Sequence, residues 1–162
     1  MNVVWTVIDS PVGELMLVAE RDGATAALTA VVFAPHGTAA GERVDDDPLL
    51  RAAHEQLSDY FAGDRTDFDL PMAPRGSTFR QLVWGKLREI PYGTTTTYGA
   101  IARDLGLTGH GARAVGLANG CNPLAIVVPC HRVVGSNGRL TGYAGGLDRK
   151  RQLLALEGGA LF

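Results

Sequence analysis

Three residues with complementary chemistry stand side by side at Cys130, His131 and Arg132, inside an apolar run from Val127 to Val134. A cysteine is a strong nucleophile only as the thiolate, and an adjacent imidazole with nearby positive charge is the usual way to obtain it. On a straight strand neighbouring side chains point to opposite faces, so Cys130 and His131 meet only where Pro129 breaks the strand, or through a water. The segment is a candidate nucleophile site. The alternative is a buried, inert cysteine.

The two cysteines, Cys121 and Cys130, do not indicate a structural role. No apolar run approaches the roughly 18 residues that cross a bilayer, and the first residues do not resemble a secretory signal, so we expect a cytoplasmic protein without a disulfide framework. Zinc is poorly supported, because these cysteines and His131 lack a fourth ligand and a CxxC pair. We expect no metal centre.

The segment from Ala112 to Asn119 predicts a helix with unusually small side chains. Such a helix can bring its backbone close to a partner, which suits the DNA minor groove of roughly 6 Å better than the wider major groove. Tight packing against a neighbouring helix is the alternative. Arg113, the one long cation of this helix, could enter the base stack where a nucleotide has been flipped out.

Charge divides the chain of 162 residues into two halves. Residues 1–74 contain 4 Arg and 13 Asp or Glu, a net charge of -9, whereas residues 75–162 contain 11 Lys or Arg and 4 Asp or Glu, a net charge of +7. This asymmetry predicts an acidic N-terminal domain at 1–74 and a basic C-terminal domain at 75–162 that faces a polyanion. Mutual attraction of the two halves is the other explanation.

The acidic half predicts an α/β domain. Alternating strands with turn residues between them are expected at Val3–Ile8, at Leu15–Ala19 and in a run that ends at Phe33. Helical spacing of apolar residues follows from Pro48 to Phe61. The three aspartates at 45–47 are expected to cap that helix, although a metal site is conceivable.

The basic half begins after a linker at Pro71–Gly76, with a helix that opens on the capping-box spacing of Thr78 and Gln81. Two short helices, Thr97–Leu105 and Ala112–Asn119, are separated by the turn Gly106–Gly111 and predict a helix-turn-helix. Further elements are a strand over Leu124–Val134, a hairpin turn at 136–138 that would form a wing, and a closing helix Leu147–Leu156 ended by Gly158.

Several of these motifs together resemble the methylated-DNA--protein-cysteine methyltransferases, the self-inactivating family that repairs O6-alkylguanine. The resemblance covers about Thr78 to Glu157 and is carried by Pro-Cys-His-Arg-Val at 129–133, Ala-Arg-Ala-Val-Gly at 112–116, Gly-Cys-Asn-Pro at 120–123 and the stretch 140–147. Ser-Pro-Val-Gly at 10–13 and Tyr-Phe-Ala-Gly at 60–63 add weaker support. No zinc-cysteine sensor module precedes the domain, so the stand-alone form is indicated.

The resemblance implies a role for individual side chains in catalysis. Cys130 would accept the alkyl group from guanine O6 and keep it as a thioether. His131 would draw the thiol proton through a water, and Glu157 would accept a hydrogen bond from the imidazole and orient it. The Tyr98 hydroxyl would protonate or hydrogen-bond guanine N3, and Asn122 would brace the turn before the cysteine.

The resemblance also implies how DNA is held. Arg113 would fill the gap left by the flipped nucleotide, on a helix face shared with Ala112, Ala114 and Gly116. The pocket for the base would be formed by Val133, with the Cys130 and Val133 carbonyls accepting from the guanine amino group, and by Tyr143, Ala144 and Gly145. The implied architecture is a ribonuclease-H-like α/β N-terminal domain and a mainly α winged helix-turn-helix C-terminal domain. The implied protein is a monomer in solution, needs no cofactor and acts on duplex DNA with O6-alkylguanine, with O4-alkylthymine as a second candidate lesion.

Rival functions and two departures from the family pattern stay open at this point. A base-flipping protein that marks lesions would lack the nucleophile, and a thiol-sensing winged-helix regulator would carry a longer polar recognition helix. A thiol hydrolase would turn over repeatedly. Cys121 adds a second thiol where none is expected, and the turn Gly106–Gly111 is about one residue longer than usual, which affects the placement of Arg113.

Overall fold

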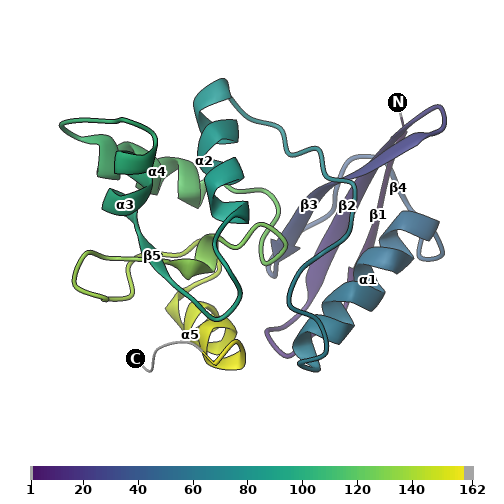
Figure 1. Cartoon of the computed structure of the whole chain (residues 1–162). Helices are drawn as coiled ribbons and strands as arrows, with labels where there is room; N and C mark the ends of the chain where they lie inside the picture. Colours follow the sequence, from purple (N-terminus) through teal and green to yellow (C-terminus); the bar gives the residue numbers. More distant parts are fainter. Residues whose placement is uncertain (1, 159–162) are drawn as a thin grey trace. The chain divides into compact units, whose positions relative to one another are not determined.

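The computed structural model describes residues 2–158, which form two compact units (Figure 1). The first unit comprises the chain up to Arg75 together with Pro123–Val127, and the second comprises Gly76–Asn122 and the chain from Val128 onward. A single division after residue 74 therefore leaves out one short segment, Pro123–Val127, which lies far along the sequence but belongs to the first unit.

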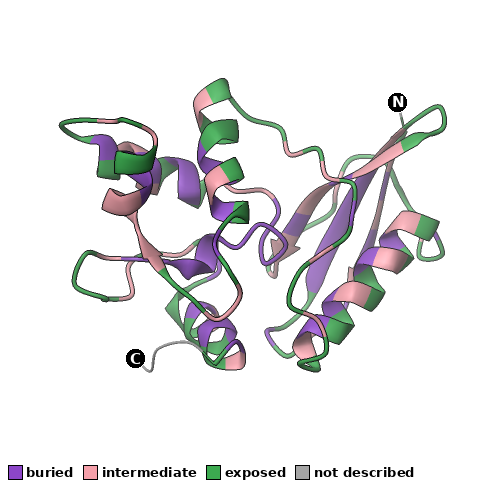
Figure 2. Ribbon diagram, in the orientation of Figure 1, coloured by how far each residue is buried: buried purple, intermediate pink, exposed green. Residues whose placement is uncertain are grey.

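The first unit is a mixed four-stranded sheet covered by one helix. The strands β1 (Asn2–Ile8), β2 (Leu15–Asp22) and β3 (Thr25–Phe33) form an antiparallel meander, and the short β4 (Glu42–Arg43) pairs parallel to β1, which gives the order β3-β2-β1-β4. The helix α1 (Pro48–Phe61) packs on the meander and buries Leu50, Ala53, Leu57 and Tyr60. The predicted meander and helix are thus present, and the buried side chains form the core of this unit (Figure 2).

Only one of the three consecutive aspartates caps α1. The Asp47 carboxylate accepts hydrogen bonds from the backbone N–H groups of Leu49 and Leu50 and also pairs with Arg21. Asp45 instead accepts from Thr6 and Arg43, and this pairing lowers the pKa of its carboxyl. Within residues 2–158, no group of three His, Cys, Asp or Glu side chains is arranged to hold a metal ion.

The second unit is mainly helical. Its helices are α2 (Thr78–Arg88), α3 (Tyr98–Asp104), α4 (Gly111–Gly120) and α5 (Leu147–Leu156), and Cys130–Arg132 forms a single 3-10 turn, η1. Two short strands, β5 (Thr96–Thr97) and β6 (Val133–Val134), pair in parallel. The predicted cap of α2 is wrong by one residue, because Ser77 has the extended backbone of an N-cap and its hydroxyl accepts from Arg80 N–H.

The helices α3 and α4 contact each other across the turn that separates them. Gly111 permits this approach, since a Cβ at that position would lie 3.3 Å from the Ala102 Cβ of α3 and 2.7 Å from the Leu107 Cβ of the turn. The helix α4 is also tied to α2, because the Trp84 indole donates to the Ala118 carbonyl at 2.9 Å. The small residues of α4 thus serve helix packing on one side, and the other side exposes Ala112, Arg113 and Leu117.

The strand predicted over Leu124–Val134 is wrong. Its first part pairs with β3, where Val31 N–H donates to the Pro123 carbonyl and Ala125 N–H donates to the Val31 carbonyl. Ile126 then adopts φ 71°, a left-handed backbone that β-branched residues rarely take, and the chain enters η1. Pro123 and Pro129 lack the N–H group that a continuous ladder requires, so the apolar run is divided.

The predicted wing is not confirmed by the described residues. The turn at 136–138 exists, with Gly135 N–H donating to the Arg139 carbonyl at 2.8 Å, but no strand follows it before residue 158. The strand β6 pairs with β5 instead of with a hairpin partner.

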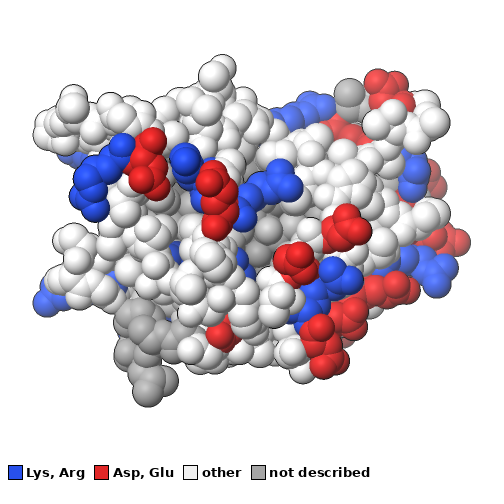
Figure 3. All heavy atoms as spheres, in the orientation of Figure 1, with Lys and Arg blue, Asp and Glu red and all other residues white. Residues whose placement is uncertain are grey.

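The first unit carries most of the acidic side chains, as the composition of residues 1–74 predicts. On the face drawn in Figure 3, Asp and Glu side chains gather over the first unit. None of the helices within residues 2–158 is long and apolar enough to cross a membrane.

Candidate active site

Cys130 begins the 3-10 turn and is 6% exposed. Its N–H donates to the Val128 carbonyl at 2.8 Å, and its carbonyl accepts from the Asn119 side chain at 3.4 Å. Burial raises the pKa of the Cys130 thiol, while hydrogen bonds from Asn122 and Tyr143 and the charge of Lys150 act in the opposite direction. The balance favours the thiol at rest, so the group needs a base before it can attack.

His131 is buried and hydrogen-bonded to a carboxylate. Its Nε2 lies 2.7 Å from Glu157 Oε2, and its Nδ1 has no partner within the described residues. With Nε2–H donating to Glu157, Nδ1 is the nitrogen able to accept a proton. Burial lowers the pKa of His131, and Glu157 partly offsets this shift. The imidazole is therefore neutral near pH 7, as a base must be.

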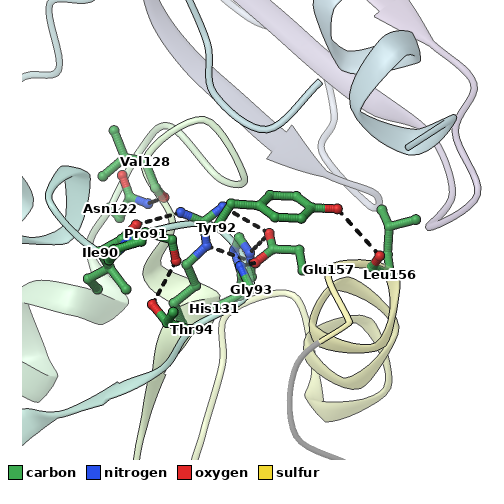
Figure 4. A network of polar contacts seen from close by, with 11 residues as sticks. Ile90, Pro91, Tyr92, Gly93, Thr94, Asn122, Val128, His131, Leu156 and Glu157 are labelled. Carbon is green, nitrogen blue, oxygen red and sulfur yellow. Dashed lines mark hydrogen bonds and ion pairs between the residues drawn. The ribbon is translucent and has the colours of Figure 1, made fainter. Parts of the chain in front are cut away.

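Glu157 lies at the end of α5, as its C-cap residue, and gathers several donors (Figure 4). Arg132 donates from Nε to Oε1 at 2.8 Å and from Nη2 to Oε2 at 3.0 Å, and Gly93 N–H donates to Oε1 at 3.4 Å. The side chains of Glu157 and His131 are 1% and 0% exposed. Sequence reasoning joined Glu157 to His131 only through the family resemblance and did not assign Arg132 to the carboxylate.

Asn122 closes the segment that precedes the cysteine. Its side-chain N–H₂ donates to the Val128 carbonyl at 2.8 Å (Figure 4), and the five residues between them, Pro123–Val127, belong to the first unit. The same side chain hydrogen-bonds the Cys130 thiol. Asn122 thus holds the backbone two residues before Cys130 and contacts its sulfur.

Tyr98, at the start of α3, is linked to the loop before α5. Its hydroxyl lies 2.7 Å from the Thr141 hydroxyl, and Gly116 of α4 lies against its ring. Lys150 is fully buried, donates to the Thr141 carbonyl at 3.4 Å and places its ammonium 5.8 Å from the Tyr143 ring centroid. Its charge lowers the pKa of Cys130.

Sequence reasoning missed Thr141 and Lys150. A signal for Lys150 was present, because Lys150, Leu153, Leu154 and Glu157 have the spacing of one helix face and all four are buried. Because Lys150 and Glu157 share a helix face with the apolar Leu153 and Leu154, this spacing predicts that both charged side chains are buried.

The remaining candidates range from exposed to buried. Arg113 and Ala112 are exposed on α4, Ala114 and Gly116 are half-buried, and Arg113 has no hydrogen-bond or ion-pair partner within residues 2–158. In the expected pocket, Val133 and Gly145 are buried, Tyr143 is half-buried and Ala144 is exposed. The described contacts thus join His131 to Glu157, Cys130 to Asn122 and Tyr143, and Tyr98 to Thr141, whereas Arg113 stands apart.

A cysteine next to an imidazole that is hydrogen-bonded to a carboxylate is typical of proteins that use an activated thiol as the nucleophile. Comparison with known proteins gives the family. Residues 3–74 match the ribonuclease-like domain of 6-O-methylguanine DNA methyltransferase, and residues 78–159 match its DNA-binding domain. The chain belongs to the 6-O-methylguanine DNA methyltransferase family.

Individual relatives agree over nearly the whole chain. Methylated-DNA--protein-cysteine methyltransferase of Mycolicibacterium paratuberculosis is 50% identical over 96% of this chain and 92% of its own, and that of Methanosarcina acetivorans is 46% identical over 95% and 97%. A crystal structure of Mycobacterium tuberculosis OGT in complex with DNA superposes with a TM-score of 0.83 at 46% identity, covering 98% of this chain and 93% of that one.

Proposed function

We propose that the protein repairs DNA by moving an alkyl group from guanine O6 to Cys130, where it stays. As a member of its family the protein is a methylated-DNA--protein-cysteine methyltransferase, and DNA is its partner. The observation that carries the assignment to Cys130 is the hydrogen bond between His131 and Glu157, which leaves the histidine Nδ1 available as a base.

The reaction balances without a further reactant. The Cys130 thiol gives its proton to His131 Nδ1, directly or through a water, and the sulfur then attacks the alkyl carbon. An S–C bond forms, the C–O6 bond breaks, and its electron pair stays on guanine. The Tyr98 hydroxyl stabilises that anion at N3, and the proton held by His131 is released to the guanine as it leaves. The thioether cannot be hydrolysed by these groups, so each chain reacts once.

The finer assignments on the DNA side are part of the same proposal. The pair α3–α4 acts as a helix-turn-helix whose second helix enters the minor groove, and the loop between β6 and α5 takes the place of a wing. Arg113 fills the gap left by the flipped nucleotide, with Ala112, Ala114 and Gly116 against the groove. The basic C-terminal part carries both DNA binding and transfer, and the lesion is O6-alkylguanine.

The base pocket, the oligomeric state, the location and a second lesion complete the proposal. Val133, Tyr143, Ala144 and Gly145 line the pocket for the base, with Tyr143 supported there by its contact with the cysteine. The protein acts as a monomer in the cytoplasm, and O4-alkylthymine is a second lesion.

Intact-mass measurement after mixing with a duplex that contains O6-methylguanine tests the function. We expect one added methylene unit per chain, located on the peptide that contains Cys130. Cys130→Ser should add nothing and still bind DNA, because a hydroxyl is far harder to ionise but similar in size. Cys121→Ser, the matched control for the other thiol, should react in full.

Each contrary result points to a different error. Full reaction of Cys130→Ser would move the nucleophile to Cys121. More than one guanine repaired per chain would indicate a thiol hydrolase. Binding of the lesion without any mass change in the wild type would indicate a protein that marks damage.

A further inference from the structure

Arg132 lies beside the proposed catalytic pair and makes more contacts than its place next to His131 requires. It forks onto both oxygens of Glu157, at 2.8 and 3.0 Å, and its third nitrogen, Nη1, donates to the Ile90 carbonyl at 2.7 Å. Its guanidinium also lies 5.7 Å from the Tyr92 ring centroid. The side chain is 7% exposed. Arg132 is therefore a fixed, buried cation held in one orientation.

The charges around Glu157 determine which form of His131 is stable. A buried carboxylate requires a positive partner, and the nearest candidates are the guanidinium and the imidazole, both hydrogen-bonded to it. Arginine stays protonated at every accessible pH, so the pair Arg132–Glu157 is already neutral. Without Arg132, protonation of His131 would neutralise Glu157 by direct contact, and an imidazolium cannot accept the proton of Cys130.

The other groups that face His131 do not change this argument. Glu157 and Lys150 act on it from α5, and Arg132 acts from its own turn; Glu157 raises the pKa of His131, whereas Arg132 and Lys150 lower it. The helix α2, which also contacts η1, contributes no charged group to this set. Lys150 donates to the Thr141 carbonyl at 3.4 Å.

We propose that Arg132 is a positioning residue for alkyl transfer, which serves as the permanent counter-ion of Glu157 and thereby keeps His131 neutral and ready to accept the Cys130 proton. This inference rests on the proposed roles of Cys130 and His131. Glu157 then has two partners with different roles. Arg132 balances the negative charge of Glu157, whereas the hydrogen bond from His131 to Glu157 orients the imidazole. The arginine acts through Glu157 and need not touch the substrate.

A merely structural role gives a different expectation. The bonds from Arg132 to Ile90 and the Tyr92 ring also connect η1 to the loop after α2, so removing them would lower the melting temperature in any case. A loss of stability alone cannot distinguish the two roles. The apparent pKa of His131 can distinguish them, because loss of a purely structural contact would not shift this pKa in a particular direction.

The test compares Arg132→Met and Arg132→Lys with the wild type, by histidine NMR titration and by single-turnover methyl transfer between pH 5.5 and 8.5. The chain contains four histidines, so a His131→Gln variant identifies the resonance. In Arg132→Met we expect the apparent pKa of His131 to rise by about 1 to 3 units, the effect of a nearby carboxylate without its counter-ion. Transfer should then fall about tenfold more at pH 6 than at pH 8.5.

Rescue variants keep the test independent of folding defects. Arg132→Lys keeps the charge and should return the titration toward the wild-type position. The double variant Arg132→Met/Glu157→Gln removes both charges and should lower the apparent pKa of His131 again. Arg21→Met breaks the pair with the buried Asp47 in the first unit and serves as the matched control, with lower stability and an unchanged pH profile.

Contrary outcomes separate this inference from the proposed function. If wild-type protein transfers methyl groups and His131 in Arg132→Met titrates within about 0.3 units of the wild type, the inference is overturned while the function stands. If the variant does not fold, the Lys variant and the double variant decide by the same titration. If the wild type transfers nothing, the function itself fails.

Discussion

The hydroxyl groups of Tyr98 and Thr141 lie 2.7 Å apart, although 43 positions separate the two residues along the chain. Tyr98 opens α3, whereas Thr141 lies in the loop before α5 and shares that loop with Tyr143. The Thr141 carbonyl also accepts from Lys150, whose charge acts on Cys130. Thr141 therefore connects the Tyr98 hydroxyl, the proposed donor to the leaving guanine, with Lys150, whose charge acts on the Cys130 thiol. The Tyr98 hydroxyl can be tested by substitution.

Tyr98→Phe should slow the chemical step more than DNA binding. The phenol is needed only as charge develops on the departing guanine, so its removal destabilises the transition state and leaves the ground state nearly unchanged. We expect a loss of about ten- to a hundredfold in the single-turnover rate at saturating DNA. Tyr60→Phe, which removes the hydroxyl of a buried tyrosine in the first unit, is the control. An unchanged rate in Tyr98→Phe would exclude the proposed role.

Arg113→Ala should slow repair in proportion to how well the target base is stacked. Extrusion of a base costs a few kcal/mol, and a side chain that fills the gap offsets part of this cost. We therefore expect the largest effect on fully paired duplex, less on a mismatched lesion and almost none on single strands. Arg51→Ala, an exposed arginine of α1, should behave like the wild type. Equal slowing on all three substrates would mean that Arg113 only contacts phosphates.

His131 should make stability depend on pH on the acid side. Burial lowers its pKa in the folded protein, whereas the unfolded chain has the ordinary value of about 6.5. The unfolded state thus binds a proton first as the pH falls, and the folded state loses up to about 1.4 kcal/mol per pH unit between the two values. Urea unfolding at pH 7.5 and pH 5 should show a smaller loss for His131→Phe. Identical losses would indicate that His131 is protonated in the folded protein.

Methylation of Cys130 should destabilise the protein that carries it. Cys130 is buried, as are its sequence neighbours Val128, Val133 and Val134 in the same unit, so an extra methyl group has little room, and overpacking typically costs about 1 to 3 kcal/mol. We expect a melting temperature several degrees lower, and a larger decrease with bulkier alkyl groups. Hydrogen exchange should accelerate first in α4, because Asn119 donates to the Cys130 carbonyl, with α1 as the internal reference. Coincident melts would show that the pocket accommodates the methyl group.

Local signals in the sequence were sufficient for the regular elements. The bounds of α1 and α5 agree with the prediction, since both helices have a periodic apolar face and a clear end. The turn residues of the meander were equally reliable. The error at Leu124–Val134 arose where an apolar run satisfied the strand pattern, while its prolines and a left-handed Ile126 divided it among a sheet edge, a 3-10 turn and a two-residue strand.

The site was only partly predictable because its partners are distant in sequence. Cys130 and His131 were predicted as neighbours in the sequence, yet the 3-10 turn that contains both was not predicted. The pairing of Arg132 with Glu157 spans 25 positions and depends on where α5 ends. No periodicity contains that information. The buried Lys150 could have been found from its helix face, whereas Thr141 carries no such signal.

Because Pro123–Val127 belongs to the first unit, the polypeptide passes between the two units three times instead of once. A fragment that starts at residue 76 would carry Leu124, Ala125, Ile126 and Val127 without the β3 edge that pairs with this segment. These side chains, all buried in the full chain, would then face water. Gene fusion or domain exchange at residue 75 thus severs a strand pairing as well as a linker. A hybrid would succeed only if the donor sheet supplied a matching edge strand.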